Sequence, residues 1–248
     1  MLVRPTSNIS ALPSGLDLRL GTLEDDQLPL ADVETVVYCA SMGFGHIPGL
    51  VRQLQSSGVR RGLFVSSTAI FTSLPAASRA PRMEAEAAVQ GSALDWTIVR
   101  PTMIYGTARD RNISRLLRFL VRCPFFPVCG NALWQPIYVE DLAVAIVSAL
   151  DSPRAIGRTY NLAGARPLRF ADLVRTAARS VGRRVGLVRV PVAAAVLAAR
   201  LTHVVTAEQV RRLTEDKAFD YADATHDFGF QPRTFAEGVR LEARGLGL

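Results

Sequence analysis

The sequence predicts an α/β protein in which helices cover a parallel sheet. Strand-like runs alternate with helical segments, and these runs are apolar throughout, as in strands buried on both faces. With 248 residues and 49% hydrophobic content, the chain is long enough for one such core, alone or with a small lobe. The clearest expected strands are 35–39, 62–66 and 96–99.

Helices are expected between these strands, at 48–57 and 81–90, because each segment begins near a proline that suits a first helical turn. From about residue 111 the composition changes to helices rich in Ala, Leu and Arg. The candidates are helices at 140–150 and 170–181 and extended pieces at 134–139 and 158–162. No linker or repeat divides the chain, so we expect one compact unit.

The three cysteines, Cys39, Cys123 and Cys129, predict reduced thiols rather than disulfides, because they are few and odd in number. The spacing of the last two matches no common metal motif, so we expect no metal. The histidines His46, His203 and His226 are scattered and form no triad or ligand set, which favours structural roles for them.

The formal net charge is +7, and Lys217 is the only lysine among 29 basic residues. The arginines are dispersed and lack aromatic interleaving, which disfavours nucleic acid as a partner. One helical stripe of arginine is visible opposite an apolar face, and a solvated surface is the favoured interpretation of it. The stripe consists of Arg111, Arg115, Arg118 and Arg122, and the apolar face of Ile113, Leu116, Leu117 and Leu120.

The N-terminal residues MLVRPTSNIS lack the apolar core of a signal peptide. The most apolar later stretch, 187–201, is interrupted by Arg189, Pro191 and Arg200 and is too short to span a bilayer. The expected compartment is therefore the cytoplasm.

Five segments, taken together and in order, resemble the extended short-chain dehydrogenase/reductase superfamily, also called the NAD-dependent epimerase/dehydratase family. They are LFVSSTAIF (63–71), LDWTIVRPTMIYG (94–106), WQPIYVEDLAVAIVSAL (134–150), YNLAG (160–164) and DFGFQPRTFAEGV (227–239). The resemblance implies a Rossmann-type doubly wound parallel sheet, shortened at the N-terminus, with a small, mostly helical substrate lobe. It divides the chain into a dinucleotide-binding part, 1–110, and a substrate lobe, 111–248, interleaved with the last sheet strands.

Small or hydroxylated residues follow three of the expected strands. Ligands of open parallel sheets bind beyond the carboxyl ends of the strands, so these residues are candidates for contacting a flat cofactor ring. An alternative is that the hydroxyl groups only cap turns. The candidate cofactor-binding residues at these ends are Ala40, Ser41, Ser66, Pro101 and Thr102.

The resemblance also implies roles near the substrate. A residue at the position of Ser67 orients a substrate hydroxyl or carbonyl in the family, and the Arg100-Pro101 turn lies against the nicotinamide. Gln135, Tyr138 and Asp141 correspond to a segment that borders the substrate pocket. For Asp141, a carboxylate favoured by the dipole at a helix start is an equally good interpretation.

The family's Tyr-x-x-x-Lys dyad is missing, because Ser78 occupies the tyrosine place and Arg82 the lysine place. An aliphatic hydroxyl has too high a pKa to replace a phenol, and an arginine cannot shuttle a proton, although it can bind a ribose. Ser67 and Thr68 therefore remain, with Arg82, as catalytic-site candidates that polarise or orient. Tyr105 is the nearest tyrosine that could substitute as a proton donor.

The glycine-rich strand, turn and helix that open a dinucleotide-binding fold are also missing. Residues 2–4 resemble the end of the second strand of that fold and 16–21 the third, and Gly43 and Gly45 form a separate turn. The loss of a central strand leaves two strand edges unpaired. The favoured explanation is that the gene starts earlier; the alternatives are a sheet that closes across the gap and a strand from a partner.

Arg4 would follow the second strand, where relatives that prefer NADP place a basic residue against the 2′-phosphate, so NADP is favoured over NAD. The expected function is that of an NAD(P)-dependent oxidoreductase or epimerase/dehydratase-like enzyme acting on a sugar nucleotide or similar polar substrate. The alternative is a non-catalytic NADP(H)-binding protein that serves a structural or sensor role. A third possibility is that the chain binds no nucleotide. In sugar-nucleotide relatives this part of the chain lies near the substrate lobe, so the arginine stripe could contact a diphosphate or, less favoured, an anionic membrane surface. The formation of a homo-oligomer is also compatible with the sequence.

Overall fold

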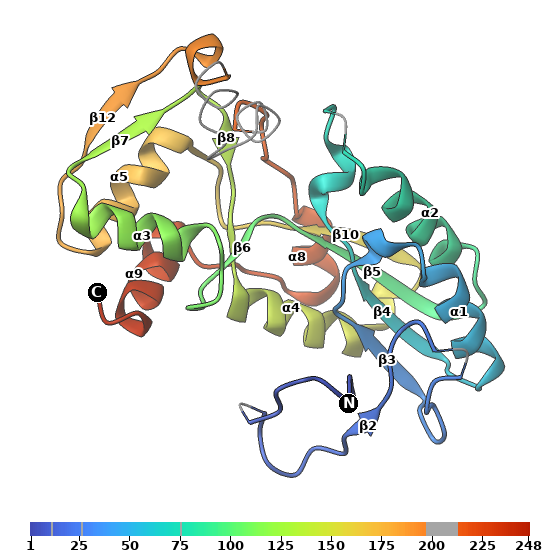
Figure 1. The fold of residues 1–248 in the computed structure, drawn as a ribbon. Helices are drawn as coiled ribbons and strands as arrows, with labels where there is room; N and C mark the ends of the chain where they lie inside the picture. Colours follow the sequence, from blue (N-terminus) through green and yellow to red (C-terminus); the bar gives the residue numbers. More distant parts are fainter. Residues whose placement is uncertain (11, 26, 75, 197–212) are drawn as a thin grey trace. The chain divides into compact units, whose positions relative to one another are not determined.

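The computed structural model describes residues 1–10, 12–25, 27–74, 76–196 and 213–248 (Figure 1). The chain divides into two compact units. The first comprises Met1–Ser66, Ala76–Ile98 and Ile156–Arg158, and the second Ser67–Pro75, Val99–Ala155 and Thr159–Leu248. His203 and the end of the apolar stretch 187–201 lie outside the described residues.

The predicted parallel sheet is present. Its strands are β3 (Thr35–Tyr38), β4 (Arg61–Val65), β5 (Asp95–Pro101) and β10 (Arg158–Leu162), in the order β10-β5-β4-β3. Strands β3 and β4 are parallel, with Thr35 opposite Arg61 and Tyr38 opposite Phe64. The three clearest expected strands, at 35–39, 62–66 and 96–99, are thereby confirmed as β3, β4 and β5, with ends that differ by one or two residues.

The core of the first unit forms where α1 (Ile47–Ser56) and α2 (Arg79–Gln90) pack together with the strands. Helix α1 buries four side chains at the spacing i, i+3, i+4 and i+7, which places them on one face. Full burial of each such side chain stabilises the fold by about 1.5–3 kcal/mol. The four are Ile47, Leu50, Val51 and Leu54. Helix α2 begins two residues before Pro81, because N–H groups of the first turn need no partner within the helix.

The N-terminal strands form a separate pair. Strands β1 (Leu2–Val3) and β2 (Arg19–Leu20) are parallel to each other, with Leu2 opposite Arg19. Among the described residues β3 is the last strand of the four-stranded sheet and does not pair with β1. The described residues thus show no pairing between β1 and the four-stranded sheet, which is the pairing that a sheet closed across the gap would have.

The second unit is mostly helical and has its own core, which includes Leu117, Leu173, Val174 and Val239. Its larger helices are α3 (Ile113–Arg122), α4 (Val139–Asp151), α5 (Phe170–Ser180), α8 (Ala222–Phe228) and α9 (Phe235–Gly245). Short strands pair locally: β6 (Ile104–Tyr105) with β9 (Ile137–Tyr138), β7 (Phe125–Val128) with β12 (Gly186–Arg189), and β8 (Leu133–Trp134) with β11 (Leu168–Arg169). The helices expected at 140–150 and 170–181 are confirmed as α4 and α5.

The unit boundary differs from the expected break near residue 110. Residues 99–110 belong to the second unit, because Met103 and Tyr105 pack in its core beside Tyr138 and Phe235. The arginine stripe has the expected geometry, since Arg115, Arg118 and Arg122 are exposed on α3 while the apolar face is buried. No helix in the described part of the chain is long and apolar enough to cross a membrane.

A buried acid makes the stability of the second unit pH-dependent. Burial and, second, the neighbouring Asp110 carboxyl raise the pKa of Glu242 from 4.5 to about 9. Between these values the folded state holds a proton that the unfolded state releases, so stability falls as the pH rises from about 4.5 to about 9. We expect Glu242→Gln to remove this loss, with a gain over wild type on the order of 2–4 kcal/mol at pH 8 and little at pH 5. Urea unfolding at both pH values measures it, and a gain that did not grow with pH would contradict it.

Candidate cofactor and substrate sites

The predicted residues Ala40 and Ser41 lie between the carboxyl end of β3 and a short turn, the 3-10 helix η1 (Met42–Phe44). Ser41 is the N-cap of this turn, and its Oγ accepts a hydrogen bond from the N–H of Gly43 at 3.2 Å. Gly45 ends the turn with φ +81°, in the left-handed region that favours glycine. Ala40 is exposed and Ser41 half-buried, so both are accessible at the strand end.

Arg82 and Ser78, the residues in the places of the missing dyad, approach this turn. Nη1 of Arg82 donates a hydrogen bond to Oγ of Ser78 at 2.7 Å, which is a contact across one turn of α2. A Cβ on Gly43 would lie 3.3 Å from Cβ of Ser78, 3.5 Å from Oγ of Ser41 and 3.6 Å from Cζ of Arg82. Three polar side chains thus converge on one glycine, and we call Ser41, Gly43, Ser78 and Arg82 the Gly43 cluster.

Ser66, at the carboxyl end of β4, is tied to the same helix. Its Oγ donates to Oε1 of Glu86 at 2.5 Å, and the two residues are 8% and 4% exposed. A buried carboxylate needs such a donor, because an unpaired one is costly. In the sequence Glu86 is visible only as part of the helix start, and the strand spacing could not show that it would meet Ser66.

The Tyr38–His46 pair is a further feature of this region that sequence reasoning missed. The Tyr38 hydroxyl donates to the carbonyl of Ser41 at 3.2 Å and also contacts Nε2 of His46. Burial raises the pKa of Tyr38 to about 12, so its phenol stays protonated at neutral pH. The pair therefore supports the backbone of the turn, consistent with the structural role expected for His46.

In the second unit, Ser67 and Thr68 begin the turn η2 (Thr68–Phe71). Oγ of Ser67 accepts from the N–H of Ala69 at 3.2 Å, so this hydroxyl caps the turn while its residue remains half-buried. Thr68 is buried and donates to the carbonyl of Pro101 at 3.2 Å. The structure therefore brings Thr68 and Pro101 together. Arg100 lies beside them, with Cζ 5.1 Å from the centre of the Phe71 ring.

Gln135 joins segments that are far apart in the sequence. Its Nε2 donates to the carbonyl of Gly164 at 2.7 Å, and its Oε1 accepts from the N–H of Phe219 at 2.9 Å. Oγ1 of Thr102 donates to the Gln135 carbonyl at 2.5 Å. Both ends of the amide thus bind backbone groups, and the side chain is 4% exposed. To contact a substrate as predicted, the Gln135 amide would have to share these hydrogen-bonding atoms between the backbone groups and the substrate.

Tyr138 lies under a cation. The Arg233 guanidinium carbon is 4.4 Å from the centre of the Tyr138 ring, and the ring is 6% exposed. Arg233 also binds Asp141, through its backbone N–H at 2.9 Å and its Nε at 2.8 Å. Asp141 lies in the first turn of α4, in agreement with the dipole interpretation of this residue. Its carboxylate also holds Arg233, which follows α8, to that turn.

The structure describes all five tyrosines, and four of them, Tyr38, Tyr105, Tyr138 and Tyr160, are between 1% and 6% exposed. Tyr105 is 1% exposed, and burial together with the negative charges of Asp141 and Glu242 raises its pKa far above the ordinary value. Its ring packs against Tyr138 and Phe235, and its hydroxyl has no hydrogen-bond partner in the described structure. Tyr221 uses its hydroxyl to bind the carbonyl of Ala165 at 3.0 Å. Tyr105 is thus a core residue.

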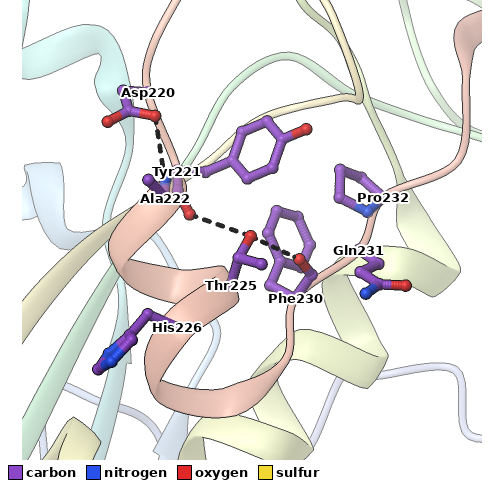
Figure 2. A pocket seen from close by; sticks show the side chains of 8 residues that line it. All are labelled: Asp220, Tyr221, Ala222, Thr225, His226, Phe230, Gln231 and Pro232. Carbon is purple, nitrogen blue, oxygen red and sulfur yellow. Dashed lines mark hydrogen bonds between the residues drawn. The ribbon is translucent and has the colours of Figure 1, made fainter.

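Three further features lie outside these groups of residues. Arg4 is exposed directly after β1, and its contact with a 2′-phosphate stays a prediction. A hollow of about 550 Å³ at α8 is lined by none of the predicted site residues. Figure 2 shows the side chains that line it. At its rim Nδ1 of His226 lies 2.8 Å from Oδ1 of the buried Asp227, which also accepts from the Tyr160 hydroxyl at 2.7 Å. In the described ranges, no cluster of His, Cys, Asp and Glu could hold a metal.

The parallel sheet, its strand order and the small residues at its strand ends define a Rossmann-type α/β protein. No family model matches the chain. Curated relatives include the mitochondrial NADH dehydrogenase (ubiquinone) 1 alpha subcomplex subunit 9 of Arabidopsis thaliana, 34% identical over 44% of this chain and 28% of that protein. They also include UDP-glucose 4-epimerase of Vibrio cholerae, 24% identical over 90% of this chain and 79% of the epimerase. The chain thus spans under a third of the plant protein.

Solved structures share the fold over most of the chain. The protein gox2253 superimposes with a TM-score of 0.78 at 20% identity, covering 99% of this chain and 89% of that one. UDP-glucuronic acid 4-epimerase of Bacillus cereus, solved with NAD, gives 0.72 at 12% identity over 93% and 81%. RMD of Pseudomonas aeruginosa, solved with NADPH, gives 0.68 at 14% over 92% and 89%. These comparisons confirm the predicted resemblance to the NAD-dependent epimerase/dehydratase proteins of the short-chain dehydrogenase/reductase superfamily.

Proposed function

We propose that the chain binds a nicotinamide dinucleotide through its first unit, with the Gly43 cluster as the main polar contact. The observation that carries this proposal is the convergence of Ser41, Ser78 and Arg82 on a residue without a side chain, at the carboxyl end of a parallel strand. Ligands of open parallel sheets bind at that end, and a glycine lets a flat ligand approach the backbone. Hydroxyl and guanidinium donors suit ribose hydroxyls and phosphates.

We further propose that binding does not lead to proton transfer by a tyrosine. When bound, the cofactor would supply or accept a hydride, and the family's chemistry needs a phenol beside it. Here Arg82 holds Ser78, and the tyrosines lie in packed interiors or bind backbone carbonyls. Neither the Ser78 hydroxyl nor the Arg82 guanidinium can exchange a proton near neutral pH. The non-catalytic alternative, a structural or sensor protein, is therefore the function that the site supports best.

A second candidate is an enzyme acting on a sugar nucleotide. It is supported by the similarity to UDP-glucose 4-epimerase, which covers 90% of the chain. It is also supported by Ser67, which keeps a half-buried hydroxyl at a strand end. In this candidate Ser67 orients the substrate, Thr68 supports the Pro101 backbone, and Gln135 and Tyr138 border the substrate. Hydride transfer would then proceed without a phenol acid.

The experiment is calorimetric titration of the chain with NADPH and NADH, followed by an assay for hydride turnover with UDP-glucose and UDP-glucuronic acid. We expect binding without turnover. Turnover that Ser67→Ala abolishes would establish the second candidate, and binding of neither nucleotide would contradict both. Arg4→Ala serves to test the preference for NADP, because loss of a phosphate contact should weaken NADPH binding by about 10-fold and leave NADH binding unchanged.

A further inference from the structure

One surface of the second unit carries a large excess of arginine. Residues 109–123 and 172–189 each contain five arginines and one acidic residue. Both acidic residues are engaged: Asp110 accepts hydrogen bonds from the N–H groups of residues 112–114, and Asp172 pairs with Arg175 at 2.9 Å. Most of these arginines are therefore uncompensated by acids of their own segments. The exposed ones include Arg115, Arg118, Arg122, Arg179, Arg183, Arg184 and Arg189.

The elements that carry these arginines are neighbours in the fold. Helix α3 packs against α5 and ends two residues before β7, and β7 pairs in parallel with β12 (Figure 1). The N–H of Gly186 donates to the carbonyl of Pro124 at 2.8 Å, and that of Val190 donates to the carbonyl of Val128 at 2.9 Å, so both ends of β12 are held to β7. The end of α3 and the two strands thus form one continuous part of the unit.

Apolar side chains stand exposed among the charges. Phe125 is 60% exposed, Val188 51% and Phe119 42%. The Phe125 ring lies over Gly186, where an added Cβ would be 2.7 Å from Cδ1 of the ring, and Val188 lies opposite Pro127. One side of the two-stranded sheet therefore carries Phe125, Pro127 and Val188, and the neighbouring segments add exposed arginines. We call these residues together the basic-apolar face, and it consists of Arg115, Arg118, Phe119, Arg122, Phe125, Pro127, Arg184 and Val188.

We propose that the basic-apolar face docks on an anionic membrane surface. Arginines near such a surface are attracted to its headgroups, and exposed Phe and Val side chains can enter the boundary between headgroups and acyl chains. Single-stranded nucleic acid fits the face less well, because it needs open aromatic faces on which bases stack. One side of the Phe125 ring is covered by Gly186, and the Phe119 ring is engaged in a T-shaped contact with Phe126. Val188 and Pro127 offer no aromatic surface.

The test is co-sedimentation of the full chain with vesicles of phosphatidylcholine, with and without one third phosphatidylglycerol, at low and high salt. We expect binding to the anionic vesicles to be at least about 10-fold tighter than to the neutral ones, and to weaken with salt as screening increases. Equal binding to the two kinds of vesicle, or binding to neither, would overturn the proposal.

Variants locate the effect on this face. Arg115→Glu with Arg122→Glu should abolish binding to the anionic vesicles, and Phe125→Ser with Val188→Ser should weaken it about 10-fold. The matched controls are Arg52→Glu with Arg60→Glu, which are exposed in the first unit, and Val144→Ser, which is 64% exposed on α4. Urea midpoints check that each variant folds. Unchanged binding by the Arg115/Arg122 variant would refute the docking face, as would displacement from vesicles by poly(U) combined with loss of poly(U) binding in the Phe125 variant.

Discussion

Arg82→Met is expected to raise the dissociation constants for NADPH and NADH by about 10- to 100-fold. A hydrogen bond to a charged group contributes about 1.5–3 kcal/mol, and each 1.4 kcal/mol is a factor of ten in affinity. In the Gly43 cluster Arg82 is the one charged member, and its guanidinium lies close to Gly43, where the proposed ligand approaches. Calorimetric titration of each variant gives the constants.

Matched variants separate this role from a structural one. Arg82→Lys keeps the cation and restores the family's residue at this place, so it should bind within about threefold of wild type. Arg52→Met removes an exposed arginine from α1, away from the Gly43 cluster, and should have no effect. If Arg82→Met folded with an unchanged urea midpoint and bound both nucleotides as wild type does, the cluster would not be the cofactor contact.

Gly238→Ala is expected to destabilise the protein by about 2 kcal/mol, although alanine is the better helix former by about 1 kcal/mol. A Cβ at this position of α9 would lie 2.2 Å from Oη of Tyr105 and 2.9 Å from its Cζ. The Tyr105 ring cannot retreat, because Tyr138 and Phe235 pack against it with ring centres 5.5 and 5.3 Å away. Overpacking should therefore outweigh helix propensity, and urea unfolding measures the difference.

The Tyr105 hydroxyl supplies the decisive comparison. Tyr105→Phe alone removes a buried hydroxyl that has no partner in the described structure, so it should be neutral or stabilising by up to about 1 kcal/mol. Combined with Gly238→Ala it should recover at least about 1 kcal/mol, because the closest clash is gone. Gly245→Ala, in the same helix with no atom within 4 Å of the added Cβ, is the control and should not destabilise. Additive effects of the two substitutions would show that the rings are not packed as described.

Much of the first unit could be predicted because its signals are local. The apolar runs at β3, β4 and β5 predicted strands, and the spacing of Ile47, Leu50, Val51 and Leu54 gives α1 a single apolar face. The expectation of burial on both faces is wrong for β3, the last strand of the sheet, where Val37 is 41% exposed. The contact between Ser78 and Arg82 also follows from positions four apart in a helix, so the likeness of this pair to the missing dyad could be predicted from the motif count alone.

The remaining site features depend on pairs that are distant in sequence. The bond from Ser66 to Glu86 spans 20 positions, and Gln135 is held by Gly164 and Phe219, 29 and 84 positions away. The second unit includes residues 99–110, which the sequence assigned to the dinucleotide-binding part. The reason is that Met103 and Tyr105 pack against residues of later helices. The spacing of apolar residues along the sequence does not show which distant segments will pack together.

By itself, the sequence determined the sheet, its helices, the family resemblance and the missing Tyr-Lys dyad, because each depends on residue type and short spacing. Only the tertiary structure decided that Tyr105 is a buried core ring and that Arg82 and Ser78 converge with Ser41 on Gly43. It also decided that β7 pairs with β12, so that Phe125, Pro127 and Val188 stand exposed on one side of the strand pair. These features arise from packing between segments that the chain brings together only when it folds, since burial and charge clustering are properties of the assembled surface.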